Sequence, residues 1–149
     1  MATQYFDNTG RSLHIDIQKA EIEDGTRIIA GNNNFIALHP FASFFPFETW
    51  IMPKIHNPSF GNISDQEINY LAAILKEILL KLYKSLNNPD YNLIIHTAPV
   101  DDEHKSYYLW YIEIIPRLTQ VAGFELGSRI TVNTALPEET ADFIRNFKI

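Results

Sequence analysis

The chain has 149 residues, enough for a single domain with its own hydrophobic core. A hydrophobic fraction of 46% and an aromatic fraction of 13% exclude a disordered chain. The absence of cysteine excludes disulfides and thiolate zinc sites, and a net charge of −6 without a cluster of Lys and Arg argues against nucleic-acid binding.

The first third of the chain combines one ambiguous segment with three predicted strands. Residues 12–23 begin with a short apolar alternation and continue as a charged stretch, so either a strand or a helix is open. Residues 26–30 and 35–39 are apolar and flank Gly-Asn-Asn-Asn, which predicts a hairpin. Residues 48–53 predict a third strand that Pro53 ends.

One long helix is predicted in the middle of the chain. Ser64 and Glu67 form a capping-box sequence, in which each side chain bonds to the backbone of the other residue. Apolar residues follow at three- and four-residue spacing: Ile68, Leu71, Leu75, Ile78, Leu82 and Leu86. We expect this stripe to pack on a sheet, and Asn-Asn-Pro-Asp at 87–90 to end the helix.

Three strands and a short helix are predicted in the second half. Residues 91–96, 106–117 and 129–133 read as strands, the first of them buried, and Pro137 suits the first position of a C-terminal helix. Runs of strands with hairpin-length connections and one long helix predict an α+β fold with a mainly antiparallel sheet. We expect it to form a single domain over residues 1–149.

The strand at 106–117 carries an isolated carboxylate. Its alternation places Tyr108, Trp110, Ile112 and Ile114 on one face, which is apolar or aromatic and predicted to face the core. The other face carries Tyr107, Leu109, Tyr111 and Glu113. A lone Glu113 within an apolar run calls for a partner or a function.

Candidate catalytic residues are few. The five histidines are His14, His39, His56, His96 and His104, and no two are spaced as local metal ligands. The sequence has no cysteine nucleophile and no serine in a nucleophile elbow, and the two glycines of 123–127 lack the strand-to-helix context of a phosphate loop.

Two of these histidines invite alternative interpretations. His96 ends a strand that can lie beside Glu113, so the two form an acid–base pair, half of a metal site, or a structural hydrogen bond. His56 follows a strand and leaves the same choice open. His39 is interpreted as a turn residue before Pro40, and His104 as a solvated loop residue.

An aromatic segment at 41–50 predicts association. Its large side chains are Phe41, Phe44, Phe45, Phe47 and Trp50. A monomer that exposed them would carry a large apolar patch, so we expect a homodimer formed through the sheet and this segment. The alternatives are that Pro40 and Pro46 fold the segment into its own core, or that the rings form a ligand cage.

The sequence gives no sign of membrane insertion or secretion. No apolar run approaches the roughly 20 residues of a membrane span. The opening MATQYFDNTGRS lacks the apolar core of a signal peptide, so we expect a cytoplasmic location.

Several blocks resemble the second half of galactose-1-phosphate uridylyltransferases, within the histidine-triad superfamily. They are YFDNTGR, DGTRII, NFIALHPFASFFPFETWIMPKIH, YNLIIHTAP and WYIEIIPRLTQVAGFELGSRITVNTALPEETADFIRN, in order over nearly the whole chain. The resemblance implies a histidine-triad-like fold, a role in galactose metabolism, and a nucleotide-sugar or hexose 1-phosphate as ligand.

The resemblance also implies that the triad is degenerate. The family's second halves commonly read His-Trp-His-Ile-Glu where this chain has Leu-Trp-Tyr-Ile-Glu, so the triad positions are Leu109, Tyr111 and Glu113. His96 matches a position associated with a zinc or iron site. Because its neighbouring ligands are lost, we expect weak or no metal binding.

Further family positions concern zinc, catalysis and the sugar. A Cys pair common in the family is replaced at Ser12 and Ile15. The family's nucleophile lies in a His-Pro-His-Pro-Gln motif of the first half, and this chain has no His-x-His. Phe124 and Glu125 match positions that reach the hexose of a neighbouring subunit, and Gln120 lies in the same loop.

Three functions follow from the resemblance. In the first, the chain acts as the second domain of a uridylyltransferase, is inactive alone, and pairs with itself or with a separate first-half polypeptide. In the second, it is a degenerate module that binds a nucleotide, a sugar phosphate or a partner protein without turnover. An independent nucleotide hydrolase is disfavoured, because no triad position holds a nucleophile suited to phosphoramidate chemistry.

Overall fold

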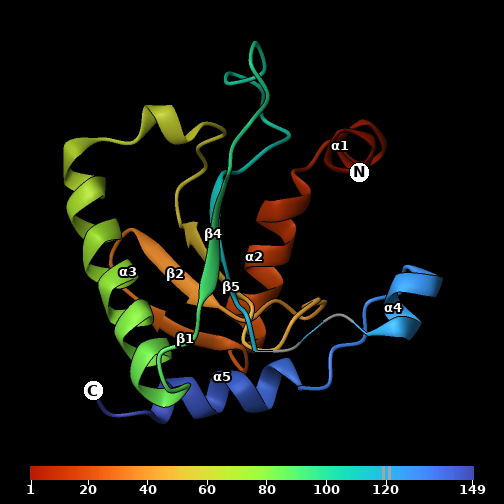
Figure 1. Ribbon diagram of the computed structural model, residues 1–149. Helices are drawn as coiled ribbons and strands as arrows, with labels where there is room; N and C mark the ends of the chain where they lie inside the picture. The colour runs from red at the N-terminus through yellow and green to blue at the C-terminus, as the bar shows by residue number, and fades with distance from the viewer. Residues whose placement is uncertain (119, 121) are drawn as a thin grey trace.

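One antiparallel sheet organises the molecule. The computed structural model describes residues 1–118, 120 and 122–149. Five strands lie in the order β1-β2-β3-β5-β4, so β1 and β4 are the edges (Figure 1). Their bounds are Ile28–Gly31 for β1, Phe35–Leu38 for β2, Thr49–Pro53 for β3, Tyr91–His96 for β4 and Tyr111–Pro116 for β5. The predicted α+β class and mainly antiparallel sheet are confirmed.

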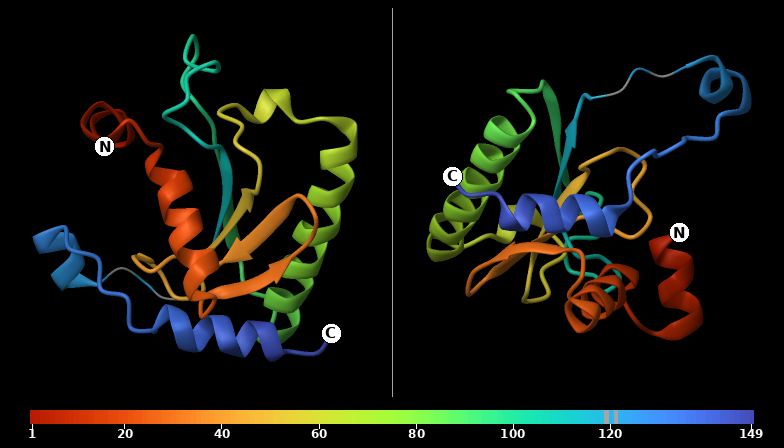
Figure 2. Two further views of the ribbon diagram at one scale, coloured as in Figure 1. Left: turned by 180° about the vertical axis from the view of Figure 1, so that it is seen from behind. Right: turned by 90° about the horizontal axis from the view of Figure 1, so that it is seen from below.

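Helices cover both faces of this sheet. The elements are α1 (Ala2–Thr9), α2 (Leu13–Asp24), the short 3₁₀ helix η1 (Phe60–Asn62), α3 (Asp65–Ser85), α4 (Gly123–Ser128) and α5 (Pro137–Asn146). The long α3 lies on one face and α2 on the other, while α5 runs across one end of the sheet (Figures 1 and 2). Within the described residues, no helix has both the length and the apolar character needed to cross a bilayer.

The two faces bury separate apolar clusters. Under α3 and α5, the side chains of Phe35, Ile51, Trp110, Ile112 and Ile114 form the larger core. On the α2 side a smaller cluster joins Ile36, Leu38, Met52, Leu109 and Tyr111. The predicted alternation is therefore confirmed over residues 109–114, with Trp110, Ile112 and Ile114 in the larger core and Leu109 and Tyr111 on the α2 side. It is wrong for Tyr108, whose ring lies 4.9 Å from that of His14 in α2.

The hairpin and the long helix form as their local sequences predict. In the turn, Asn32 Oδ1 accepts hydrogen bonds from the amides of Asn34 and Phe35, at 3.0 and 2.9 Å. At the start of α3, Ser64 Oγ accepts the Glu67 amide at 3.3 Å, while Glu67 Oε2 accepts the Ser64 amide at 2.9 Å. The predicted stripe fails at one position, since Ile68 is 46% exposed.

One open segment and one predicted boundary are decided by the structure. The segment left open at 12–23 is helical, as α2 (Leu13–Asp24), and Gly25 caps this helix with a left-handed φ of 71°. The strand predicted over 106–117 begins only at Tyr111, because the amide of Trp110 donates to Asn57 O in a loop at 3.0 Å.

The strand predicted at 129–133 is wrong. These residues lie in an exposed connection after α4, with Ile130 59% and Val132 50% exposed. The Val132 amide donates to Glu125 Oε1 at 3.4 Å, so a side chain takes the place of a strand partner. High β-propensity produces a strand only where a neighbouring strand supplies hydrogen bonds. The C-terminal helix α5, with Pro137 at its first position, is confirmed.

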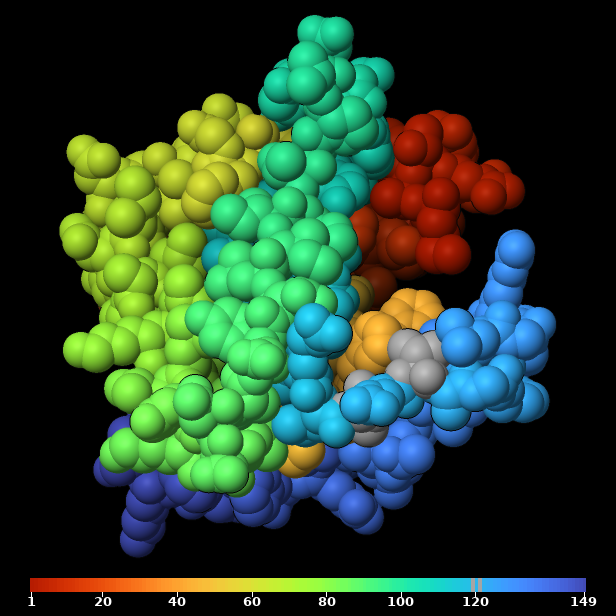
Figure 3. All heavy atoms as spheres, in the orientation of Figure 1, coloured from red at the N-terminus to blue at the C-terminus, as the bar shows by residue number. Residues whose placement is uncertain are grey.

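The edge strand β4 is also not the buried strand that its sequence suggested. Its apolar side chains remain half-exposed, with Leu93 and Ile94 at 40% and Ile95 at 41%. The space-filling view shows the residues around 91–96, in green, uncovered on the front of the molecule (Figure 3). An edge strand has one hydrogen-bonded neighbour, so its free side remains available to another chain.

Candidate functional site

His96 and Glu113 meet across the two last strands of the sheet. The β4–β5 register sets His96 opposite Tyr111 and Ile94 opposite Glu113. His96 Nε2 lies 2.6 Å from Glu113 Oε2, with side-chain exposures of 30% and 14%. The predicted proximity of these two residues is therefore confirmed. Because Nε2 contacts the carboxylate, Nδ1 is the nitrogen left for any other partner.

Tyr111 is the centre of an aromatic cluster on the same face. Its ring stacks on His96 at 4.4 Å between centroids and 16° between planes. Trp50 packs on it at 4.6 Å, and His14 at 5.3 Å. Burial, the largest cause, raises the pKa of the Tyr111 phenol above its ordinary value, so the hydroxyl stays protonated at neutral pH.

Glu48 is a functional candidate that the sequence analysis missed. Its side chain is fully buried, and Oε2 accepts the amides of Phe44 and Phe45 at 2.7 and 3.3 Å. Oε1 accepts a hydrogen bond from Trp50 Nε1 at 3.0 Å. Burial, together with the nearby Glu113 carboxylate, raises the pKa of Glu48. An acid within the apolar stretch FPFETW was the available signal.

His14 was also missed as a contributor to this face. It reaches the cluster from α2, with its ring 4.9 Å from that of Tyr108, and is only 9% exposed. Burial first, and then the neighbouring His96, lowers the pKa of His14 to about 4. No sequence signal was available, because the segment did not decide between strand and helix.

The remaining histidines occupy separate places. His56 Nε2 donates to Tyr108 O at 2.8 Å, which is a structural contact. His39, predicted as a turn residue, is instead fully buried, with Nδ1 2.8 Å from Thr140 Oγ1. It lies inside because it directly follows β2 and is covered by α5. His104 is exposed, as expected.

The residues at the predicted metal positions do not suit a zinc or iron site. Leu109 is fully buried and apolar, Tyr111 holds its proton, and His96 Nε2 is already bonded to Glu113. Ser12 is buried, and Ile15 packs against the smaller core. Across the described ranges, no three His, Cys, Asp or Glu side chains gather as a metal-binding group. A tight zinc site ordinarily uses three or four protein ligands.

The predicted sugar-contacting residues lie apart from this face. Phe124 and Glu125 belong to α4, on an arm of residues 122–136 that extends away from the sheet (Figure 1). Phe124 is 62% exposed, whereas Glu125 Oε2 accepts the Ala122 amide at 2.7 Å. Gln120 is exposed just before this arm. The structure brings Phe124 and Glu125 together but does not bring them to His96.

Comparison with known families agrees with the fold. The family described as galactose-1-phosphate uridyl transferase, C-terminal domain, matches residues 1–145. The chain belongs to this family.

Curated relatives and solved structures agree with this membership. An ADP-glucose phosphorylase from Arabidopsis thaliana is 34% identical over 147 residues, covering 97% of this chain and 40% of that protein. A galactose-1-phosphate uridylyltransferase from Haemophilus influenzae is 30% identical over 115 residues, covering 76% of this chain and 33% of its own length. The crystal structure of the Arabidopsis phosphorylase with bound ADP-glucose superposes with a TM-score of 0.87 at 32% identity, over 99% of this chain and 47% of that one.

Family members of this kind are longer than this chain, which spans less than half the length of these relatives. A zinc-bound histidine-triad protein from Mycobacterium smegmatis shares only the fold, with a TM-score of 0.55, 18% identity, and coverage of 79% of this chain and 80% of that one. The histidine-triad-like fold is thus confirmed.

Proposed function

We propose that this chain acts as the C-terminal-type half of a nucleotide-sugar–hexose-1-phosphate nucleotidyltransferase. It supplies sugar contacts and an association surface, and it does not transfer a nucleotidyl group alone. One observation carries the proposal: the strand that presents the triad in this superfamily has a buried leucine, a protonated tyrosine and a hydrogen-bonded glutamate at those positions, Leu109, Tyr111 and Glu113.

The absence of transfer follows from the chemistry of these side chains. Transfer through a covalent nucleotidyl intermediate needs a nucleophile that reaches the α-phosphorus. Leu109 has no such atom, and the Glu113 carboxylate is held by His96. The sequence has no His-x-His from which the family's nucleophile is drawn. A second polypeptide that carries this motif would have to supply it.

The arm is the proposed source of the sugar contacts. Phe124 offers an exposed ring, and the aliphatic face of a hexose packs on such rings. Glu125 carries acceptor oxygens for hexose hydroxyls beside it, and Gln120 an amide. The arm returns to the body where Asn133 Nδ2 donates to Ser43 O at 3.1 Å, so it is anchored at that point while α4 extends outward.

The isolated chain is expected to show no transfer between UDP-glucose and galactose 1-phosphate. The same expectation holds with ADP-glucose, which the Arabidopsis relative binds in its crystal structure. Product formation is measured by chromatography, with the His96→Ala variant as the background. Turnover above that background would overturn the proposal. As a positive control, the chain is mixed with a first-half polypeptide that carries the His-x-His motif, and product should then appear.

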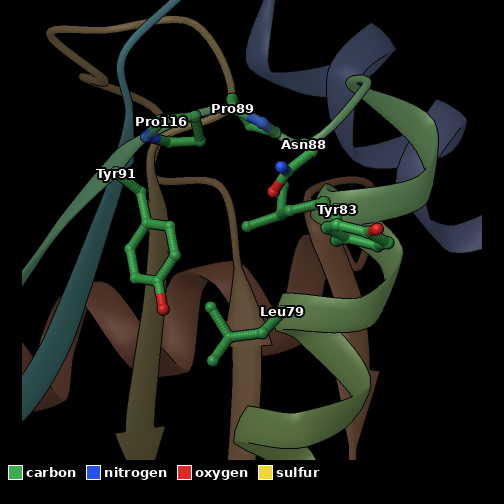
Figure 4. A pocket seen from close by; sticks show the side chains of 7 residues that line it. Leu79, Tyr83, Asn88, Pro89, Tyr91 and Pro116 are labelled. Carbon is green, nitrogen blue, oxygen red and sulfur yellow. The ribbon is translucent and has the colours of Figure 1, made fainter.

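The proposed association surface lies along β4. Its half-exposed apolar side chains point to both sides of the sheet, and its outer backbone groups have no strand partner among the described residues. Beside it, Leu79 and Tyr83 of α3 line a recess of about 40 Å³ with Tyr91 and Pro116 (Figure 4). Apolar flanks beside a free strand edge suit a second copy of this chain, paired edge to edge.

Some rings of the aromatic segment are exposed and available for association, while others pack in the core. Phe41 and Phe44 are 73% and 62% exposed, whereas Phe47 packs against the larger core. The two exposed rings are therefore the part of the segment that remains for a partner. Each contributes roughly 1.5–3 kcal/mol when fully buried.

Light scattering at tens of micromolar is expected to give twice the 17.2 kDa mass of one chain. Ile95→Lys at the β4 edge should give a monomer with little change in melting temperature, because an edge lysine opposes strand pairing. Phe44→Asp tests the aromatic segment in the same way. Ile22→Lys, at an isoleucine on α2 that is 51% exposed, is the matched control and should stay dimeric. A monomeric wild-type chain would rule the dimer out.

The second candidate function is a binding module without catalysis. It is favoured by the exposed rings of the arm and of the 41–47 loop, which require no nucleophile to act. Titration calorimetry with UDP-glucose, ADP-glucose and galactose 1-phosphate separates the two. Product in the mixed assay supports the transferase half, whereas binding without product in any mixture supports the module.

A further inference from the structure

The residues at the degenerate triad face form one continuous set of contacts across three strands. Glu48 Oε1 accepts Trp50 Nε1 at 3.0 Å, and the Trp50 ring packs on Tyr111 at 4.6 Å. Tyr111 stacks on His96 at 4.4 Å, and His96 Nε2 contacts Glu113 at 2.6 Å. We call these five residues the clasp. It connects β3, β5 and β4.

We propose that the clasp replaces a metal ion at this position, and that it couples edge strand β4 to the loop of residues 41–47. The proposal concerns the free chain and goes beyond the proposed function. It rests on the chemistry of the side chains at the family's metal positions. Leu109 has no donor atom, the Tyr111 phenol is protonated, and His96 Nε2 is already bonded to the Glu113 carboxylate.

The clasp adds side-chain contacts to β4, which is an edge strand of the sheet. Among the described residues it pairs with β5 alone, and its apolar side chains remain about 40% exposed, so burial fixes it weakly. His96 is the last residue of the strand, directly before the connection at 97–110. Just beyond it, the Ala98 amide donates to Pro58 O and the Phe60 amide donates to Thr97 Oγ1, each at 3.0 Å. The hydrogen bond and the ring stack of His96 therefore act together with these neighbouring contacts at this end of the strand.

At its other end the clasp holds the 41–47 loop. Glu48 accepts the amides of Phe44 and Phe45, so its carboxylate fixes the loop backbone. The same carboxylate fixes Trp50, and Trp50 packs on Tyr111. Loosening His96 allows Tyr111 and Trp50 to relax, and this movement reaches the loop through Glu48. The two surfaces proposed for association are therefore coupled.

Hydrogen exchange measured by mass spectrometry tests this coupling. His96→Ala should speed amide exchange on the order of tenfold in residues 93–96 and also in residues 43–47. Asn92→Ala is the matched control, because Asn92 lies on the same face of β4 outside the clasp. It should leave residues 43–47 unchanged. His96→Phe, which keeps the ring but loses the hydrogen bond, should fall between wild type and His96→Ala.

Unchanged exchange at 43–47 in His96→Ala would overturn the coupling. A second experiment tests the replacement of the metal, with wild-type protein dialysed against zinc chloride or against EDTA. Metal analysis should give far less than one equivalent of zinc, and EDTA should leave the melting temperature unchanged. A stoichiometric metal, or a lower melting temperature in EDTA, would overturn the replacement. Neither readout depends on transferase activity, so these results stand apart from the proposed function.

Discussion

Replacing Arg27 with methionine is expected to lower the free energy of unfolding by about 3–5 kcal/mol. Arg27 precedes β1 and is only 14% exposed at its side chain, where Nε lies 2.7 Å from Glu21 Oε2. Nη1 lies 2.7 Å from Glu138 Oε1, so one guanidinium joins α2 to α5. Methionine keeps most of the side-chain volume but leaves the buried Glu21 carboxylate without its cation.

The matched control for this variant is Arg11→Met. Arg11 forms an ion pair with Asp16 of α2 at 2.8 Å, but its side chain is 66% exposed. Exposed pairs contribute about 0–1 kcal/mol, so this variant should unfold almost as wild type does in urea. Adding Glu21→Gln to Arg27→Met should recover part of the lost stability by removing the unpaired charge. Equal losses for Arg27→Met and Arg11→Met would refute the role of burial.

Local signals predicted the elements whose formation depends on adjacent residues. The capping box of Ser64 and Glu67 and the Asn-rich turn after β1 fix their backbone by nearby hydrogen bonds, and both form as expected. The strand at 129–133 failed for the opposite reason, because its formation depends on a neighbour that sequence does not supply. The exposure of β4 likewise depends on sheet order, which places that strand at an edge.

The candidate site was predictable along one strand but not across elements. Period-two spacing placed Leu109, Tyr111 and Glu113 on one face, and the β4–β5 register then brought His96 to it. His14 arrives from α2, whose helical state was undecided in the sequence. Glu48 stands out in the sequence as an acid within an apolar stretch, but its hydrogen bonds to the 41–47 loop are seen only in the structure. Contacts made by side chains from separate elements need the tertiary structure.

Stability is expected to fall steeply as the pH drops from about 6.5 to about 4, because two histidines are buried in the neutral form. Burial lowers the pKa of His39 from 6.5 to about 4. Burial and the nearby His96 lower the pKa of His14 to about 4 as well. Within this window the unfolded chain binds a proton on each imidazole while the folded chain does not. Unfolding therefore takes up protons, and acid favours it.

Each shift corresponds to about 3 kcal/mol at the acid end of the window, so the two together approach the whole stability of an ordinary domain. The raised pKa of Glu48 acts in the opposite direction, since its contribution to stability is present at low pH and is lost as the pH rises.

Urea unfolding at several pH values between 7 and 4 measures the net slope of stability against pH. His39→Gln should make the slope shallower by about 1.4 kcal/mol per pH unit within the window. His104→Gln, at an exposed loop residue, is the control and should leave the slope unchanged. If His39→Gln and wild type lose stability in parallel, His39 is protonated in the folded chain and the argument from its burial fails.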